Sequence, residues 1–409
     1  MNKRFFRMGV LTLILVFVLG NGLSTLFAQD DTPLIAVLLP DSASSARWEN
    51  DDRRFLTEAF EEAGVDFSIE NAEGDPTTQI SLAEQAITNG ADVLMFVNLD
   101  SGSGAAIVQL ARDAGIPIID YDRLTIEGPG ADYYVSFNNE AVGRLQGEGL
   151  VAAIEAQYGE DLSMGDLGED GLLDVAVLNG SPTDNNATLF KNGYDSVINP
   201  FFEDSESGWN EVDDQSVPNW DNQEALVIYE QILTAEGGDV DATIAANDGL
   251  AQAVITARQA QGLDPIPLTG QDATVGGIQQ ILAGWQSMTV YKAIRQQAGA
   301  AAELAIALAN GDQEAADALA MDVSTYESGG ETVEVASVLL VPVAVTIDNI
   351  AETVIEDGFR TWEEICVGEF AEFCPEDAMM DDMGDEDMDD EDMDDDEDMD
   401  DEEEGEDDE

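Results

Sequence analysis

The chain has 409 residues with 14 Lys or Arg against 88 Asp or Glu, so its formal net charge is −74 at pH 7. Nucleic-acid binding would need the opposite charge balance. The chain contains no histidine, which excludes a Ser-His-Asp triad and an imidazole-ligated metal site. The length is enough for two domains with full-sized cores, and a hydrophobic content of 44% indicates that most of the chain folds.

The N-terminus has the layout of a secretory signal. Lys3, Arg4 and Arg7 precede an apolar run over residues 8–19 and then small and polar residues up to Ala28. We expect residues 1–28 to be a signal peptide cleaved after Ala28, although Leu26 is large for its position and an uncleaved anchor stays open. No Cys follows the apolar run, which argues against a lipid-modified N-terminal Cys. The mature chain is therefore expected to be exported and soluble, in the periplasm or at an extracellular cell surface.

Strands and helices alternate along the first part of the chain. Apolar runs predict strands over 34–40, 67–69, 91–97, 116–119 and 133–137. Helical spacing fills the intervals over 51–63, 78–89 and 104–114, and another helix begins near residue 140. This alternation is typical of a parallel, doubly wound α/β sheet.

The same pattern returns later in the chain. Residues 78–98 align with 222–247, and residues 104–122 align with 249–272, which pairs Asp122 with Asp272. The alternative explanation is that any two strand–helix–strand units look alike, because Gly and Pro residues mark the ends of their elements. The length of the match favours two copies of one unit, and two such lobes would face each other across a cleft.

The remaining elements complete the second lobe and return to the first. We predict a strand over 173–178, a helix through Lys191, a strand over 288–291, an alanine-rich helix to about residue 309 and a last strand over 337–345. The expected lobe boundaries are 30–137 with 292–325, and 138–291 with 326–366.

The C-terminal part holds the two cysteines and an acidic tail. Cys366 and Cys374 lie eight positions apart, and in an oxidising compartment a disulfide is favoured over a metal site. Residues 376–409 contain 25 acidic residues and no basic one, which predicts disorder. Calcium binding there, or at 166–174, stays an alternative, but neither stretch has the Gly and Glu positions of a calcium loop. Residues 29–375 alone carry 63 acidic and 11 basic residues, a balance that suits an extracellular or salt-rich setting.

Polar side chains gather where the predicted strands end, and in open α/β sheets ligands bind at the carboxyl ends of strands. The candidates are Arg47, Trp48, Asp122, Arg123, Asp184, Asn186, Asn247, Asp248, Gln271, Asp272 and Lys292, with Trp220 in a loop. Carboxylates and amides accept from sugar hydroxyls, Arg, Asn and Lys donate to them, and indoles pack on the sugar ring. Binding of an amino acid or a phosphate would instead require a basic pocket.

Several of these residues have a purely structural alternative. Asp122 and Arg123 could form an ion pair that ends a strand, Trp48 could belong to the core, and Asn247 could cap the following helix. As a set at the ends of repeat-related strands, they favour ligand binding.

Seven stretches of this sequence resemble the periplasmic D-xylose-binding proteins of ABC sugar transporters. The stretches are ARW at 46, DYDRL at 120, YYVSFNNEAVGRLQ at 133, NGSPTDNNATLF at 179, AANDGLA at 245, TGQDA at 269 and MTVYK at 288. The likeness covers nearly all of residues 33–360. It departs from the family at an apparent insertion over 161–173, in the loop before Trp220 and in the acidic tail.

The resemblance implies the type I periplasmic binding fold, in which two Rossmann-like doubly wound lobes are joined by three hinge crossings. It also implies that a pentose is hydrogen-bonded by Arg47, Arg123, Asp184, Asn186, Asn247, Asp272 and Lys292, with Trp48 and Trp220 beside its ring. The implied partners are a monosaccharide and a membrane ABC permease.

We therefore expect an exported, monomeric sugar-binding protein with no catalytic residue, metal or cofactor and no nucleic-acid partner. D-xylose, another aldopentose and a hexose all stay open as ligands. A secreted glycoside hydrolase using Asp184 and Asp272 is the enzyme alternative, and a sensor that hands its closed form to a membrane receptor is compatible as well. A transcriptional regulator is excluded by the signal sequence and by the absence of a basic helix-turn-helix.

Overall fold

A computed structural model describes residues 32–162, 168 and 171–376. The predicted signal peptide and nearly all of the predicted disordered tail lie outside these residues, as does part of the predicted insertion. Among the described helices, none combines the length and the apolar character that crossing a bilayer requires.

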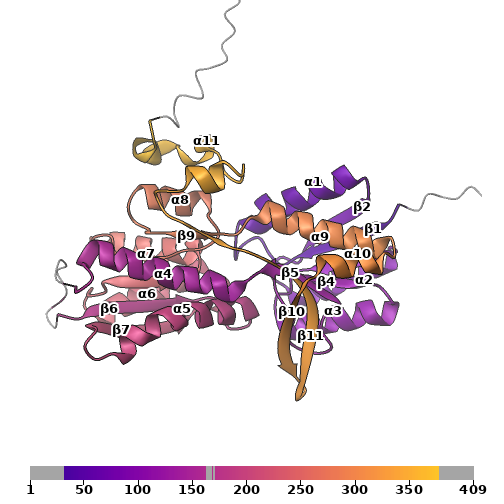
Figure 1. The fold of residues 1–409 in the computed structure, drawn as a ribbon, viewed down its shortest axis with the longest axis horizontal. Coiled ribbons are helices and arrows are strands. Elements are labelled where there is room, and N and C mark those ends of the chain that lie inside the picture. The colour runs from indigo at the N-terminus through magenta and orange to yellow at the C-terminus, as the bar shows by residue number, and fades with distance from the viewer. Residues whose placement is uncertain (1–31, 163–167, 169–170, 377–409) are drawn as a thin grey trace, which may run out of the picture. The chain divides into compact units, whose positions relative to one another are not determined.

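The first lobe is built on a seven-stranded sheet of the described residues (Figure 1). Its order is β10-β11-β5-β4-β3-β1-β2, and every neighbouring pair is parallel except β10 with β11. The strands are β1 (Leu34–Leu39), β2 (Asp66–Asn71), β3 (Val93–Phe96), β4 (Ile118–Tyr121), β5 (Tyr133–Phe137), β10 (Asp322–Ser328) and β11 (Glu331–Leu340). Its helices are α1 (Arg53–Ala63), α2 (Pro76–Thr88), α3 (Ser101–Ala114), α9 (Ile294–Ala309) and α10 (Gln313–Leu319), with the π-helical turn η1 (Trp48–Asp52) before α1.

Local sequence signals define these elements. The central strands β1, β3, β4 and β5 are almost wholly buried, as expected for parallel strands covered on both faces. Asp75 caps α2 by accepting from the amides of Thr77 and Thr78. Gly115 ends α3 at a φ of 73°, in the left-handed region that glycine adopts without strain.

The second lobe has the same α/β arrangement but is built on two sheets with fewer strands. Its strands are β6 (Leu173–Asn179), β7 (Trp209–Ser216) and β8 (Ala242–Ala245), in the order β7-β6-β8, and the antiparallel pair β9 (Thr289–Tyr291) and β12 (Val343–Val345). Its helices and helical turns are α4 (Asn139–Tyr158), α5 (Asn185–Glu203), η2 (Pro218–Trp220), α6 (Asn222–Ala235), α7 (Asp248–Gln261), α8 (Val275–Leu282), η3 (Ala351–Ile355), α11 (Trp362–Ile365) and η4 (Gly368–Phe373). The prediction of an α/β fold with two doubly wound lobes is confirmed.

Helices α4 and α5 pack against each other at unusually short range. A Cβ atom at Gly143 would lie 1.9 Å from the carbonyl oxygen of Phe190, and one at Gly193 would lie 2.3 Å from that of Glu140. Only glycine fits at these two positions. The close approach fixes the start of α5, where two candidate site residues lie.

The chain crosses between the lobes after β5, after β9 and after β11. The predicted strand over 337–345 is wrong as a single element, because it is divided between β11 of the first lobe and β12 of the second. Pro342 lies between the two and lacks the N–H that would continue a ladder. The expected assignment of 326–366 to the second lobe is likewise wrong for residues 326–340, because β10 and β11 form a hairpin that extends the first sheet beside β5.

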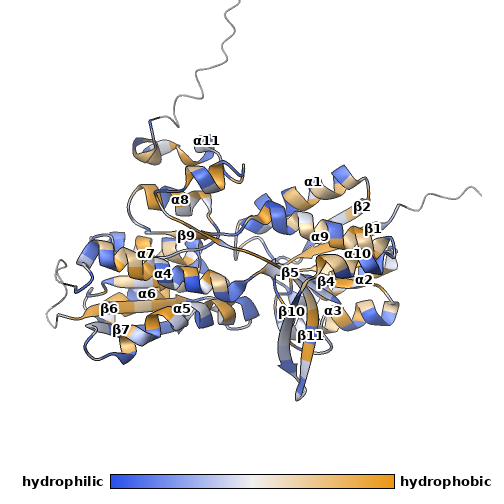
Figure 2. Cartoon of the chain, viewed as in Figure 1, coloured by the Kyte–Doolittle hydropathy of each residue, from blue (hydrophilic) through white to orange (hydrophobic). Residues whose placement is uncertain are grey.

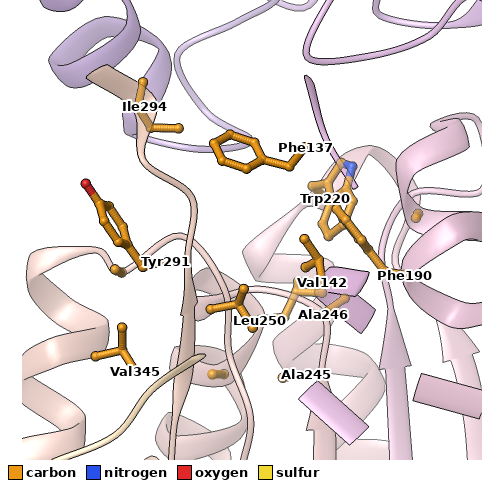
Figure 3. Packing of buried hydrophobic residues seen from close by; sticks show 14 of the residues in the cluster. Phe137, Val142, Phe190, Trp220, Ala245, Ala246, Leu250, Tyr291, Ile294 and Val345 are labelled. Carbon is orange, nitrogen blue, oxygen red and sulfur yellow. The ribbon is translucent and has the colours of Figure 1, made fainter. Parts of the chain in front are cut away.

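The apolar side chains concentrate inside the lobes. Figure 2 shows hydrophobic colour along β6 and mixed colours on the helices around it. Figure 3 shows part of the largest buried cluster, in which Phe190 and Trp220 lie close together. Sequence patterning missed β7, a mainly polar and acidic strand whose apolar residues are Trp209 and Val212. Cys366 and Cys374 form a disulfide in the segment after the last strand, as favoured from their spacing.

Candidate ligand-binding site

All nine residues predicted to bind the ligand line one cavity between the lobes. The cavity encloses about 330 Å³ of space between protein atoms, part of it open to solvent. Its lining residues are Ser44, Ser45, Arg47, Trp48, Asp122, Arg123, Asp184, Asn186, Phe190, Trp220, Asn247, Gln271, Asp272 and Lys292. Residues almost 250 positions apart in the sequence therefore meet here.

Arg47 anchors the first-lobe wall. Its Nε and Nη2 donate to the two carboxylate oxygens of Asp52 at 2.8 Å each, and its Nη1 donates to Oδ2 of Asp122 at 3.0 Å. Nη2 also reaches Oε1 of Gln297 on α9 at 3.2 Å. Tyr121 donates its hydroxyl to Asp52 at 2.8 Å, so this wall is a closed network within one lobe.

The network controls the ionisation of its members. Burial alone would raise the pKa of Asp122, but the charges of Arg47, Lys292 and Arg123 outweigh it and lower the pKa to about 2. Burial raises the pKa of Asp52 in spite of Arg47. Burial would also lower the pKa of Arg47, yet Asp122 and Asp52 raise it well above its ordinary value, so the guanidinium stays charged.

Arg123 connects the lobes. It follows β4 in the first lobe, and its Nε lies 2.9 Å from Oδ2 of Asp184 at the start of α5. Its guanidinium also lies 5.4 Å from the ring centroid of Trp48, while that of Arg47 lies 4.4 Å from the same ring. Both arginines are thus within cation–π range of one indole.

Asn186 makes the second link between the lobes. Its Nδ2 donates to the main-chain oxygen of Asp122 at 2.9 Å, and its Oδ1 accepts from Nδ2 of Asn139 at 2.8 Å. Asp184, two residues earlier, caps α5 by accepting from the Asn186 amide at 2.9 Å. The amide side chain of Asn186 is largely engaged by protein groups.

Trp220 closes one side of the cavity. Its indole nitrogen donates to Oδ2 of Asp184 at 3.1 Å, and its ring makes an edge contact with Phe190 at 6.4 Å between centroids. Gly180 leaves space for this ring, because a Cβ there would lie 2.0 Å from it. The backbone of Trp220 has a φ of 56°, a rare conformation for a bulky residue.

The second-lobe wall is less complete. Asp272 has a φ of 96°, also rare for a side chain of this kind. Lys292 Nζ forms an ion pair with Asp272 Oδ1 at 3.0 Å, and this oxygen has no further hydrogen-bond partner among the described residues. The buried Oε1 of Gln271 has none there either, although its Nε2 donates to the Ala246 oxygen at 3.3 Å.

Two structural alternatives from the sequence apply in part. Trp48 does belong to the buried apolar cluster, and it lines the cavity as well. Asn247 does cap α7, accepting from the Leu250 amide at 2.9 Å, and it lines the cavity as well. Asp248 is outside the cavity lining. It accepts from Gln286, Thr289 and Thr274, and burial raises its pKa to about 6 in spite of these bonds.

Sequence reasoning did not select Ser44, Ser45 or Phe190. Phe190 follows Asn186 by one helical turn on α5 and ends the stretch NGSPTDNNATLF, and these are the signals that point to it. Among the described residues, no group of three or more Cys, Asp or Glu side chains is arranged to hold a metal. The cavity instead offers alternating acceptors and donors around two indoles, which suits a small polyhydroxylated ligand.

The comparisons with known proteins agree with this geometry. The model of the periplasmic binding protein domain matches residues 35–313. The chain belongs to the periplasmic binding protein family.

The chain is similar in sequence to the D-xylose-binding periplasmic proteins of Escherichia coli and Haemophilus influenzae. Each is 37% identical to this chain, over 80% of this chain and 90% of the relative. A solved ABC transporter solute-binding protein of Clostridium phytofermentans with bound β-D-glucose matches with a TM-score of 0.71 and 26% identity, over 81% of this chain and 99% of that one. The predicted family and the type I periplasmic binding fold are confirmed.

Proposed function

We propose that this chain is an exported binding protein that captures a monosaccharide between its lobes and delivers it to an ABC permease. D-xylose is the proposed first ligand. The observation that carries the proposal is the convergence of nine selected residues, from both lobes, on one cavity of suitable chemistry. The names of the xylose-binding relatives support the sugar, while the glucose-bound solved structure keeps a hexose open.

Donors and acceptors in the cavity fit a sugar better than other small solutes. Arg47, Arg123 and Lys292 supply cationic donors, and four buried carboxylates in and behind the wall balance them. Such a site is close to neutral, so it has no excess charge for a phosphate or an amino acid. The indoles of Trp48 and Trp220 offer flat apolar faces for the C–H groups of a ring.

Lobe closure is the proposed mechanism. A sugar that bonds to first-lobe and second-lobe groups at once makes its full set of contacts only in the closed state, so binding shifts the population towards that state. The closed form then presents surfaces of both lobes together to a permease. Delivery to a membrane receptor would use the same closed form.

A hydrolase is a poorer match to the same groups. Asp184 lies beside Arg123 at 2.9 Å and accepts from Trp220, and Asp272 lies beside Lys292 at 3.0 Å. Both carboxylates are thus held beside protein cations, an arrangement that suits ligand binding better than proton transfer. We therefore propose no catalytic role, and release of the aglycone from an aryl glycoside would contradict this.

A thermal-shift screen against monosaccharides tests the proposal. A ligand present at 100 times its Kd stabilises the folded state by about 2.7 kcal/mol, which is readily measured. We expect D-xylose, alone or with a close epimer, to raise the melting temperature. If no monosaccharide does so, the proposed ligand class is wrong.

A further inference from the structure

Arg360 connects the two lobes behind the ligand cavity. It lies between η3 and α11, in a C-terminal segment fixed to the second lobe by the bond from Gln279 Nε2 to the Ile365 oxygen at 2.8 Å. Its Nη1 and Nη2 donate to the two carboxylate oxygens of Asp51 in η1 of the first lobe, at 2.8 Å each. Its Nε donates to the main-chain oxygen of Ala273 in the second lobe at 3.2 Å.

Both partners of Arg360 lie next to residues that build the site: Ala273 adjoins a lining residue, and Asp51 adjoins a residue that holds one. Asp51 precedes Asp52, whose carboxylate holds Arg47 in the first-lobe wall. Ala273 follows Asp272 in the second-lobe wall, and both have positive φ values, 45° and 96°. One guanidinium therefore contacts the backbone segments that present the site cation on one side and the site carboxylate on the other.

The surroundings make this contact rigid. Asp51 is 2% exposed and Arg360 8%, so the pair is screened little by solvent. The guanidinium also lies 3.8 Å from the ring centroid of Phe359. Phe359 stacks on Phe55 of α1 and packs against Tyr291 of β9, so it too contacts both lobes.

We infer that Arg360 is a positioning residue: by bonding Asp51 and the Ala273 carbonyl, it holds Arg47 and Asp272 at the separation that the ligand requires. The inference rests on the proposed function for its effect on affinity. The effect of Arg360 on the segments around Asp51 and Ala273 does not depend on any ligand.

The first variant is Arg360→Met, but it leaves Asp51 buried with only Arg54 nearby, at 3.5 Å. An unpaired buried carboxylate destabilises a fold by itself. The double variant Asp51→Asn/Arg360→Met removes both charges and keeps the site groups, so it separates positioning from stability. Arg295→Met is the matched control, since Arg295 stacks on Phe55 at 4.3 Å and pairs with Glu58, also in the first lobe.

Monosaccharide titrations of these variants form the affinity arm of the test. We expect the double variant to melt near the parent temperature and to bind the sugar at least tenfold more weakly, with Arg295→Met within twofold of the parent. Arg360→Lys, which keeps the charge, is expected to recover part of the loss. Parent affinity in the double variant, or an equal loss in Arg295→Met, would overturn the inference.

Hydrogen exchange of the ligand-free protein forms the second arm. Loss of the contact is expected to speed exchange at least threefold in peptides covering 47–56 and 268–275, one from each lobe, and to leave β6 unchanged. If both peptides exchange as in the parent, Arg360 does not position them. If no sugar binds the parent, the proposed function fails, and this arm still decides the role of Arg360.

Discussion

The two walls of the cavity differ in how completely their polar groups are paired. In the first-lobe wall, Arg47 bonds to Asp52, Asp122 and Gln297, all within the same lobe. In the second-lobe wall, Oδ1 of Asp272 has its ion pair with Lys292 but no further hydrogen-bond partner among the described residues, and the buried Oε1 of Gln271 has no partner there. The first wall is therefore a fixed electrostatic frame, and the second keeps acceptors for the ligand, because an unmet buried acceptor gains most from a new donor.

Removing the guanidinium that holds the first-lobe wall together should have the largest effect on stability. Arg47→Met leaves Asp52 and Asp122 buried without their guanidinium, and removing one partner of a buried ion pair costs about 3–5 kcal/mol of stability. We expect a marked fall in the denaturant midpoint of unfolding even without ligand. Arg144→Met, which loses only an exposed pair with Glu148, serves as the control and should unfold like the parent. A parent-like midpoint for Arg47→Met would contradict the frame.

Removing the second-lobe carboxylate should weaken binding, and it also leaves the buried Lys292 without its ion-pair partner, which lowers stability. Asp272→Ala deletes a buried charged acceptor, and we expect a loss of about 1.5–3 kcal/mol of sugar-binding free energy. Titration calorimetry measures the loss. Asp248→Asn is the comparison variant, since Asp248 lies in the same lobe outside the cavity lining and its partners are protein groups. Unchanged affinity in Asp272→Ala would remove Asp272 from the site.

A smaller effect is expected from the indole of Trp220, which lies in the second lobe. Trp220→Phe keeps an aromatic ring beside Phe190 but loses the N–H that donates to Asp184 at 3.1 Å. One hydrogen bond to a charged group contributes about 1.5–3 kcal/mol. Because Arg123 still pairs with Asp184 in the variant, we expect the sugar-binding free energy to weaken by an amount near the lower end of this range. The readout is affinity, with Trp209→Phe as the control, because Trp209 packs on Phe201 away from the cavity lining. Equal affinities for both variants would show that the Trp220 N–H contributes nothing.

The last prediction concerns the pH dependence of stability, and its sign follows from burial. Asp120 on β4 has its pKa raised by burial to about 7, although Thr125 donates to it twice. A raised pKa in the folded state gives stability that is complete below the unfolded pKa and is lost as pH rises through about 7. The pKa of Asp122 is lowered to about 2, so this carboxylate acts in the opposite sense. Its contribution to stability is lost only as pH falls from about 4 towards 2.

We therefore expect the melting temperature to fall between pH 5 and pH 8. The chain has no histidine, so perturbed carboxyl groups dominate this range. Asp120→Asn should flatten the profile, and high salt should be used in both proteins to suppress general repulsion between acidic groups. A slope that is the same in the variant and the parent would show that Asp120 is not responsible.

Much of this molecule can be predicted from sequence, for identifiable reasons. Buried parallel strands such as β1 and β5 are continuous apolar runs, so their bounds follow from composition alone. The nine site residues follow strand ends or stand in motifs, and the structure brings all of them to one cavity. Whether each contacts a ligand stays a prediction.

The parts that sequence reasoning missed depend on distant partners or on sheet edges. Strand β7 is half-polar because it lies at the edge of its sheet, so it lacks the apolar signal. The division of 337–345 between two sheets depends on pairing with β5 and β9, which composition does not reveal. Arg360 and Asp51 are 309 positions apart, and neither lies in a recognisable motif.

The most direct test of the central claim is a calorimetric titration of the protein with D-xylose and, in parallel, with D-glucose. The account predicts one saturable site per chain for at least one of these sugars, and weaker binding of that sugar by Asp272→Ala. Saturable binding that Asp272→Ala leaves unchanged would place the ligand outside this cavity, and the absence of heat with either sugar would contradict the proposed ligand class.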